Sequence, residues 1–360
     1  MTMPPVDNGG LPTVADVARA AGASKATASR ALGGYGRVSE ATRARVLAAA
    51  RQLGYTANGL AKAMNTGRSD SIGVVSRGAF NPLWQESFLA MTSVMRDAGL
   101  TLLFAASDYD VEHERRAVSL LMSKRIDALI VSAADARETQ HLHAVHRRGT
   151  PIILFERSVP GLHVPVVEAE FSAPSAELAR LLRHHGHRRI AFVTSLGMPG
   201  LRYQLGDQLG VSTIEQRLAG LYGTLATEGL RPSLDLIRMP GRDRSAIREA
   251  FLDLLAAADP PTALVASDSF IAETMLQVVR ERGLRVPRDL SIAMFDDPSW
   301  ATLVDPTMTV ISQPNEEMGL AAARLALESI DDPQLPREVA PFPASLIERG
   351  SVGRAPVAGR

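Results

Sequence analysis

The chain has 360 residues, which at roughly 100 to 200 residues per domain predicts two or three domains. It is 46% hydrophobic and 22% charged, as in a globular protein, and has no apolar run near the roughly 20 residues of a membrane span. No secretory signal is visible before Pro12, so we expect a cytoplasmic protein with no membrane partner. The absence of cysteine excludes disulfides, thiolate catalysis and Cys-ligated metals.

The charge is unevenly distributed along the chain. Residues 1–68 contain nine Lys or Arg and three acidic residues, a net charge of +6, so the remainder carries −6. This asymmetry predicts a small basic module that binds a polyanion, attached to a larger acidic body that does not. The alternative is chance scatter of charged residues.

Three short helices are predicted within the first 55 residues. Each follows a Ser or Thr that can cap it: Thr13, Ser24 or Ser39. Asp16 completes a capping-box pattern with Thr13, and the second helix runs from Lys25 to Leu32. A helix, a short turn with glycine and a second helix fit a helix-turn-helix, in which the second helix enters the DNA major groove. The alternative is a small protein-binding bundle with solvated polar faces.

The segment from Pro12 to Met64 reads PTVADVARAAGASKATASRALGGYGRVSEATRARVLAAARQLGYTANGLAKAM and resembles the headpiece of the LacI–GalR family of bacterial transcription regulators. The resemblance implies that Lys25, Ala26 and Arg30 read base edges. It also implies a hinge helix from Asn58 to Met64, with Met64 as the wedge in the minor groove. The expected DNA-binding residues are Thr13, Ser24, Lys25, Ala26, Thr27, Ser29, Arg30, Tyr55, Asn58 and Met64.

Beyond residue 70, short apolar runs alternate with longer amphipathic stretches. The predicted strands are 71–75, 101–105, 128–131, 152–155, 190–193, 263–266 and 291–295, with a last strand at 344–348. The predicted helices are 84–98, 113–123, 176–185, 215–227, 245–257 and 271–282. Alternation of this kind predicts parallel sheets in two halves, with a cleft at the carboxyl ends of the strands.

This body resembles the periplasmic-binding-protein-like core of the same family, with markers such as Phe155-Glu-Arg157, Ser267-Asp268 and Phe295-Asp-Asp297. The implied fold is an N-terminal all-α helix-turn-helix headpiece plus an α/β two-lobed periplasmic-binding-protein-like core. The expected boundaries are a disordered N-terminus at 1–11, a helix-turn-helix domain at 12–56, a hinge helix and linker at 57–70, a core at 71–351 and a tail at 352–360. The lobes are expected to divide near 167, with the chain recrossing near 297 and 328.

The resemblance places an effector between the lobes, in contact with Phe80, Trp84, Glu156, Arg217, Ser267, Asp296 and Gln313. Carboxylates, an amide and an Arg suit a polyhydroxylated ligand, so a sugar or sugar derivative is the favoured effector. Alternatively, Glu156 forms an ion pair with Arg157 or another neighbour, and Asp296 and Asp297 are solvated acids of a turn.

These features together predict a dimeric, sequence-specific DNA-binding regulator, most often a repressor in this family, acting on a palindromic operator and controlled by its effector. A tetramer is an alternative assembly. We expect no cofactor, no catalytic residues and no metal site, because the histidines at 141, 143, 146, 184, 185 and 187 lack a ligand spacing completed by carboxylates. The rival classes are a solute-binding protein and an α/β enzyme acting on a small polar molecule.

Overall fold

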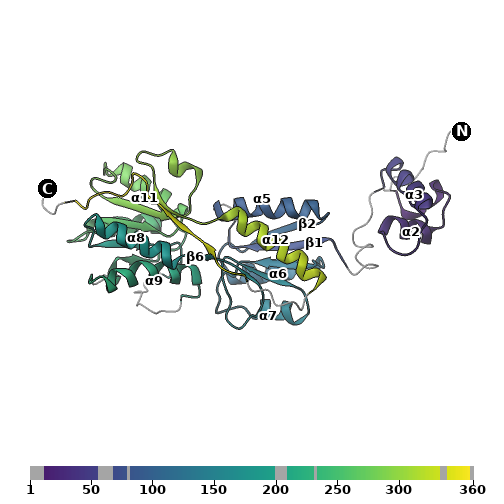
Figure 1. Cartoon of the computed structure of the whole chain (residues 1–360), viewed down its shortest axis with the longest axis horizontal. Coiled ribbons are helices and arrows are strands. Elements are labelled where there is room, and N and C mark those ends of the chain that lie inside the picture. The colour runs from purple at the N-terminus through teal and green to yellow at the C-terminus, as the bar shows by residue number, and fades with distance from the viewer. Residues whose placement is uncertain are drawn as a thin grey trace. The chain divides into compact units, whose positions relative to one another are not determined.

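The computed structural model describes residues 12–55, 68–78, 82–198, 209–230, 233–332 and 339–356. The chain divides into two compact units, one with the N-terminal helices and one with the two large β-sheets (Figure 1). We call residues 12–55 the headpiece and residues 72–356 the core, and describe each by itself. No helix within the described ranges is long and apolar enough to cross a membrane.

The headpiece consists of α1 (Val14–Ala20), α2 (Lys25–Gly33) and α3 (Glu40–Gln52). Its predicted caps are confirmed: Thr13 and Asp16 form the reciprocal capping box, and Ser24 and Ser39 accept hydrogen bonds from backbone amides three residues later. The three helices enclose a small core of Val and Ala side chains: Val17, Ala18, Ala21, Ala28, Ala31, Val46, Ala49 and Ala50.

The first lobe of the core contains a five-stranded sheet in the order β2-β1-β3-β4-β5. Its strands are β1 (Ser71–Ser76), β2 (Thr101–Ala106), β3 (Ala128–Val131), β4 (Ile152–Phe155) and β5 (Val166–Val167). α5 (Pro82–Asp97) and α12 (Asn315–Asp331) lie on one face, with α6 (Val111–Ser123) and α7 (Gln140–Arg147) on the other (Figure 1). Strands β3 and β4 are buried throughout, which explains their unbroken apolar sequences.

The second lobe contains a six-stranded sheet in the order β13-β11-β10-β9-β7-β8, in which only the pairing of β13 with β11 is antiparallel. Its strands are β7 (Ile190–Val193), β8 (Ile237–Arg238), β9 (Ala263–Ala266), β10 (Ser291–Phe295), β11 (Thr309–Ser312) and β13 (Ser345–Ile347). Its helices are α8 (Ser172–His184), α9 (Ser212–Thr227), α10 (Arg244–Ala256) and α11 (Ser269–Glu281), with short 3-10 turns at Leu234–Leu236 and Ser299–Thr302.

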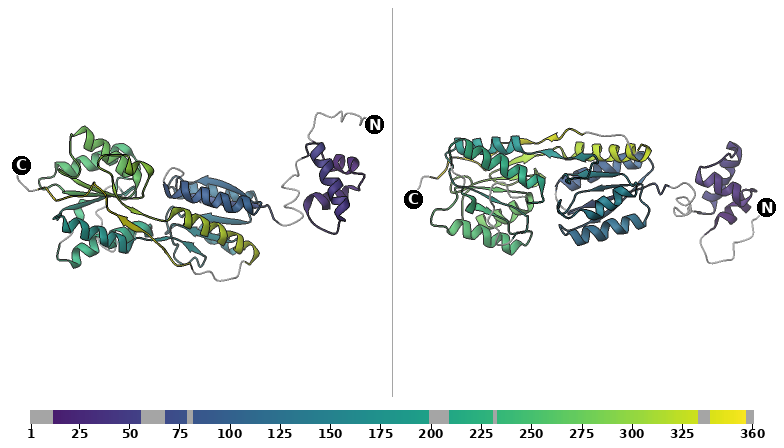
Figure 2. Two further views of the ribbon diagram at one scale, coloured as in Figure 1. Left: turned by 45° about the horizontal axis from the view of Figure 1, so that its top comes forward. Right: turned by 90° about the horizontal axis from the view of Figure 1, so that it is seen from below.

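The chain passes between the lobes in three segments. The first follows β5 and includes β6 (Ala169–Glu170), which pairs with β12 (Phe342–Pro343) of the returning segment. The expected recrossing near 297 is wrong, because β11 still belongs to the second sheet and the chain leaves it at Gln313–Pro314. The expected recrossing near 328 falls inside α12, so the chain returns only after that helix (Figure 2).

Helix α12 packs closely on α5 in the first lobe although about 220 residues separate them in sequence. Gly319 permits this approach, since a Cβ atom there would clash with the backbone oxygen of Ser87. The Ser87 hydroxyl donates a 2.6 Å hydrogen bond to the backbone oxygen of Asn315 at the start of α12. This packing fixes the helix that follows the second crossing, and thereby the position of Gln313 just before it.

Candidate effector cavity and DNA-binding surface

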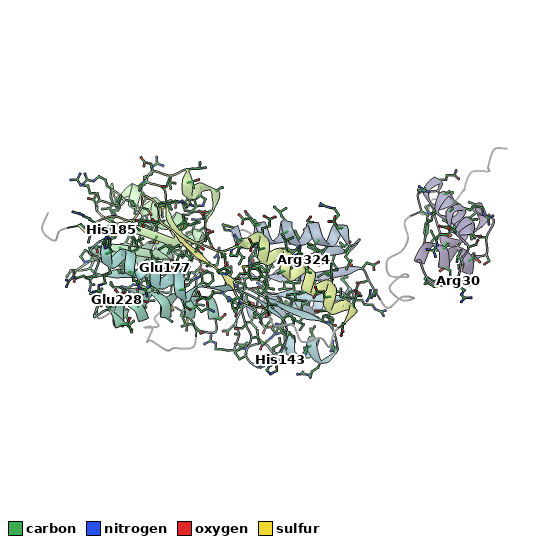
Figure 3. The ribbon with its side chains drawn as sticks, in the orientation of Figure 1. Arg30, His143, Glu177, His185, Glu228 and Arg324 are labelled. Atoms are coloured by element: carbon green, nitrogen blue, oxygen red, sulfur yellow. The ribbon has the colours of Figure 1, made fainter. Side chains whose placement is uncertain are left out.

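Helix α2 presents polar and basic side chains on its outer face. Lys25, Ala26 and Arg30 are exposed, and Ala26 and Arg30 share one side of the helix because they are one turn apart. Figure 3 shows Arg30 extending away from the headpiece. Its Nε donates a 3.3 Å hydrogen bond to the backbone oxygen of Ala26, which leaves the terminal nitrogens directed outward. This face can therefore offer donors to base edges or phosphates.

Other predicted DNA-binding residues also have structural roles. The hydroxyl of Thr13 lies 2.7 Å from the Asp16 carboxylate, and the Ser24 and Thr27 hydroxyls lie 2.8 Å apart in the α2 cap. The hydroxyls of Ser29 and Tyr35 form a 2.8 Å hydrogen bond. Tyr35 was not among the residues expected from the sequence. Tyr55 is half-buried against the headpiece core. Asn58 and Met64, with the expected hinge helix, lie outside the described residues, as does Phe80 of the expected effector site.

The headpiece has a strongly positive surface. Between residues 13 and 55 there are seven Lys or Arg and two acidic side chains. Within the described part of the chain, only Arg19 is paired with a carboxylate, that of Asp16 at 3.1 Å. Six cations that lack a described acidic partner form a surface suited to a polyanion.

The core contains a cavity of about 680 Å³ lined by both lobes. The first lobe contributes residues that follow β1, β2, β3 and β4, and the second contributes α9 and the residues after β7, β9 and β10. The charged lining side chains are Arg77, Asp108, Asp135, Arg137, Glu156, Arg157, Arg217, Arg242, Arg244, Asp268, Glu273 and Asp296. The cavity thus lies at the carboxyl ends of parallel strands, where α/β folds bind their ligands.

Four of the expected effector residues line this cavity: Glu156, Arg217, Asp296 and Gln313. Glu156 and Asp296 occupy equivalent places, each directly after a buried strand that ends in phenylalanine. Each also has a positive φ, 71° for Glu156 and 75° for Asp296, a conformation that non-glycine residues adopt at a cost. The strained turns direct one carboxylate from each lobe toward the same space.

Glu156 is surrounded by arginine side chains. Arg77 donates to its Oε1, and the hydroxyl of Ser132 donates to its Oε2 at 3.1 Å. Although burial by itself would raise the pKa of Glu156, the guanidiniums of Arg77, Arg157 and Arg217 hold it below its usual value. The expected alternative, an ion pair of Glu156 with Arg157 or another neighbour, is therefore confirmed, and the partner is Arg77.

Arg217 lies between two aromatic rings in the second lobe. Its guanidinium carbon is 4.2 Å from the ring centroid of Phe171 and 4.4 Å from that of Phe295. One terminal nitrogen donates a 2.6 Å hydrogen bond to the backbone oxygen of Ser267. Burial lowers the pKa of Arg217, against the opposing attraction of Asp296. The aromatic clamp holds the guanidinium in a fixed orientation at the cavity wall.

Asp296 and Asp297 have different environments, and neither is a free turn acid. Asp296 is only 5% exposed and accepts a 3.3 Å hydrogen bond from the backbone amide of Ser269. Burial raises its pKa to about 6, while Arg217 opposes the rise. Asp297 points elsewhere and forms a two-pronged ion pair with Arg349, with N–O distances of 2.7 and 2.6 Å.

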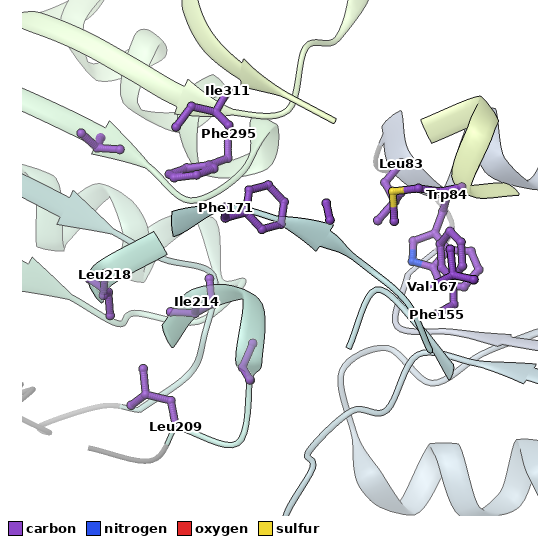
Figure 4. Close-up of a cluster of buried hydrophobic side chains, with 14 of the residues drawn as sticks. Leu83, Trp84, Phe155, Val167, Phe171, Leu209, Ile214, Leu218, Phe295 and Ile311 are labelled. Atoms are coloured by element: carbon purple, nitrogen blue, oxygen red, sulfur yellow. The ribbon is translucent and has the colours of Figure 1, made fainter. Parts of the chain in front are cut away.

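Two expected effector residues do not line the cavity. Trp84 is 2% exposed and packs in the first-lobe core against Phe155, with ring centroids 4.9 Å apart (Figure 4). Its neighbour Leu83 lines the cavity instead. Ser267 is fully buried: it accepts from the amide of Ser195 and donates to Asp268, which caps α11. Ser267 therefore supports the cavity wall from behind.

Sequence reasoning missed several lining residues: Arg77, Tyr109, Arg157, Arg242, Asp268 and Ser269. Arg77 directly follows β1, and Arg157 is the second residue after β4, a signal that was available in the sequence. The sequence does not show that Tyr109 and Phe270 share a contact with Arg242. In the structure their ring centroids lie 4.4 and 4.3 Å from its guanidinium carbon. Among the described residues, no three His, Asp or Glu side chains are grouped to hold a metal ion.

Comparison with known proteins finds the same two parts, a helix-turn-helix headpiece and a two-lobed core. Residues 13–58 match the model of bacterial regulatory proteins of the lacI family, and residues 179–352 match the periplasmic binding protein-like domain. The HTH-type transcriptional regulator GalR of Escherichia coli K12 is 28% identical over 95% of this chain and 96% of its own length.

Solved structures show the same similarity. A LacI-family transcriptional regulator from Silicibacter pomeroyi aligns with a TM-score of 0.78 at 24% identity, over 95% of this chain and all of that one. The transcriptional regulator CelR, in a complex with cellobiose, aligns with a TM-score of 0.67 at 26% identity, over 94% of this chain and 99% of that one. With a lacI-type headpiece and a two-lobed core in one polypeptide, the chain belongs to the LacI–GalR family of transcription regulators.

Proposed function

We propose that this chain is a sequence-specific DNA-binding transcription regulator, acting as a repressor, whose operator affinity is controlled by a small polar effector. The observation that carries the proposal is the exposed face of α2 on a basic helix-turn-helix, in the same chain as a polar cavity lined by two lobes. Such a protein acts where the chromosome is, which in a bacterial cell is the cytoplasm. We propose no catalytic role for the cavity.

In this function, Lys25, Ala26 and Arg30 contact base edges in the major groove. Arg30 donates to guanine acceptors, Lys25 donates to guanine or to a phosphate, and Ala26 contacts a thymine methyl. The DNA sugar-phosphate backbone beside these bases receives hydrogen bonds from the hydroxyls of Ser24, Thr27 and Ser29. The minor groove is contacted by Asn58 and Met64. A homodimer places two headpieces on the two halves of a palindromic operator, and a tetramer would join two such dimers.

The effector is proposed to be a sugar or sugar derivative. Glu156, Asp296 and Gln313 supply acceptors for hydroxyl groups, and Arg217 supplies donors. CelR, the regulator solved with cellobiose, shows that a protein with this core can hold a carbohydrate. Because both lobes line the cavity, an effector that fits one lobe arrangement better than another shifts the balance between them, and thus the DNA affinity.

The proposal is tested by selecting a preferred operator from random palindromes and measuring binding of the full chain by fluorescence anisotropy. Arg30→Ala should reduce the preference for the selected operator over a scrambled duplex by about 10- to 100-fold per half-site, because each half-site loses one bidentate base contact. The control is Arg45→Ala, which removes an exposed charge from α3 and should weaken both complexes alike. A wild-type chain that binds all sequences equally would refute the proposal.

A further inference from the structure

The cavity holds an excess of buried positive charge. Three of its guanidiniums are more than nine-tenths buried: Arg77 at 8% exposure, Arg157 at 3% and Arg217 at 6%. Only two lining carboxylates are buried to the same degree, Glu156 and Asp296, each 5% exposed. The excess grows whenever Asp296 takes up a proton.

Arg157 is the guanidinium with the fewest compensating contacts. One terminal nitrogen donates to the backbone oxygens of Ala133 and Ala134, both at 3.3 Å. Within the described ranges its Nε has no acceptor, and no carboxylate lies within ion-pair distance of it. Burial, together with repulsion from Arg77, lowers its pKa to about 9, which shows how poorly the surrounding groups compensate its charge.

The other two arginines complete a cluster around a single carboxylate. Arg77, Arg157 and Arg217 all act electrostatically on Glu156, and only Arg77 is within ion-pair distance of it. The Nε atoms of Arg77 and Arg217 also lack acceptors in the described structure. Leaving charged donors unsatisfied in a protein interior is costly, so an arrangement of this kind is stable in a ligand complex that supplies the missing negative charge.

We infer that the effector carries an oxyanion, the carboxylate of a sugar acid or the phosphate of a sugar phosphate, bound by Arg157 together with Arg77 and Arg217. This inference rests on the proposed regulatory function and narrows its effector class. Guanidinium groups match both anions because two parallel N–H donors fit two oxygens. The remaining polar lining, including Asp296, Ser269 and Gln313, suits the hydroxyl groups of the same molecule.

The test measures thermal unfolding of the full chain with matched probes at constant ionic strength: glucose, gluconate, glucuronate and glucose 6-phosphate. At a saturating concentration, an anionic probe that fits should raise the melting temperature of the core by about 5 °C, and glucose should have little effect. The carboxylate and phosphate probes distinguish the two sources of the anion. The inference is overturned if no anionic probe stabilises the wild type, or if glucose stabilises it equally.

Variants then locate the anion. Arg157→Gln should abolish the response while leaving the unliganded chain as stable as the wild type, because an uncompensated buried charge is removed. Arg157→Lys keeps the charge but not the paired N–H donors, so the rise in melting temperature with the anionic probe should be smaller. If the glutamine variant does not fold, the lysine variant provides the test. The exposed Arg148→Gln is the charge-matched control in the same lobe. An undiminished response in both Arg157 variants would contradict the assignment.

Operator binding without effector is measured separately for each variant. If the Arg157 variants bind the selected operator normally but ignore the anion, the regulatory function and the anion site are both supported. If the wild type responds to anions but binds no operator, the regulatory proposal fails while the anion site stands.

Discussion

Replacement of Asp296 by Asn should change how the stability of the core depends on pH. The carboxyl group is 5% exposed, and burial raises its pKa from 3.8 to about 6. A shift of about two pKa units corresponds to about 3 kcal/mol of unfolding free energy at roughly 1.4 kcal/mol per unit. Since the native state binds the proton more tightly, this stability is fully present below pH 3.8 and is lost as the pH rises through about 6.

The Asn side chain cannot ionise, so Asp296→Asn removes this pH-dependent loss. Relative to the wild type, the variant should gain up to about 3 kcal/mol of stability between pH 4 and pH 7.5, and most of the gain should be complete above pH 6. All other ionisable groups are common to both proteins, so their contributions largely cancel in the difference. The figure already includes the attraction of Arg217, because the pKa of about 6 results from burial opposed by that charge.

Urea unfolding followed by tryptophan fluorescence measures this difference. The chain has two tryptophans, Trp84 in the first lobe and Trp300 in the second, so the signal reports on the core and contains no headpiece contribution. The free energy of unfolding would be determined for both proteins at pH 4, 5, 6 and 7.5. A difference that is independent of pH, or that favours the wild type as the pH rises, would refute the assignment of Asp296 as a buried, largely uncompensated acid.

Three further substitutions test the packing, the cap and the turn. Gly319→Ala should destabilise the core by about 1 to 3 kcal/mol in urea unfolding because of the clash with α5, whereas Gly223→Ala, with nothing within 4 Å of its new Cβ, should be neutral or slightly stabilising; equal effects would contradict the close-packing argument. Thr13→Ala should cost the headpiece about 1 kcal/mol and speed hydrogen exchange in α1, and unchanged exchange rates would contradict a stabilising role for the capping box. Asp297→Asn should lower core stability by about 1 to 3 kcal/mol through loss of its pair with Arg349 but leave the effector response intact, and a lost response would move Asp297 into the site.

Much of the secondary structure could be predicted because its signals are local. Thr13, Ser24 and Ser39 can each cap a helix without any distant partner, and all three do so. Strands such as Ile152–Phe155 are continuous apolar runs because the sheet is covered on both faces. The position of Glu156 and Asp296 at strand ends was likewise visible, since polar residues that follow buried parallel strands share one edge of a sheet.

Other features depend on residues far apart in the chain. The pairing of β10 with β11 and the docking of α12 on α5 decide where the chain crosses between lobes, and neither α12 nor β11 was predicted. Trp84 looked like a ligand-contacting aromatic from its sequence neighbours, but its packing on Phe155 places it in the core. A short apolar or aromatic segment does not specify its partner, because many partners bury it equally well.

Local signals in the sequence predicted most of the helices and strands, the basic headpiece and the two-lobed core, since caps, periodicity and charge are local properties. The grouping of side chains in the cavity, by contrast, depends on the tertiary structure. Arg77, Arg157 and Arg217 come from three separate segments, and only folding brings them near Glu156 and away from water. Their interaction depends on distance and burial, and neither quantity can be read from positions along the chain.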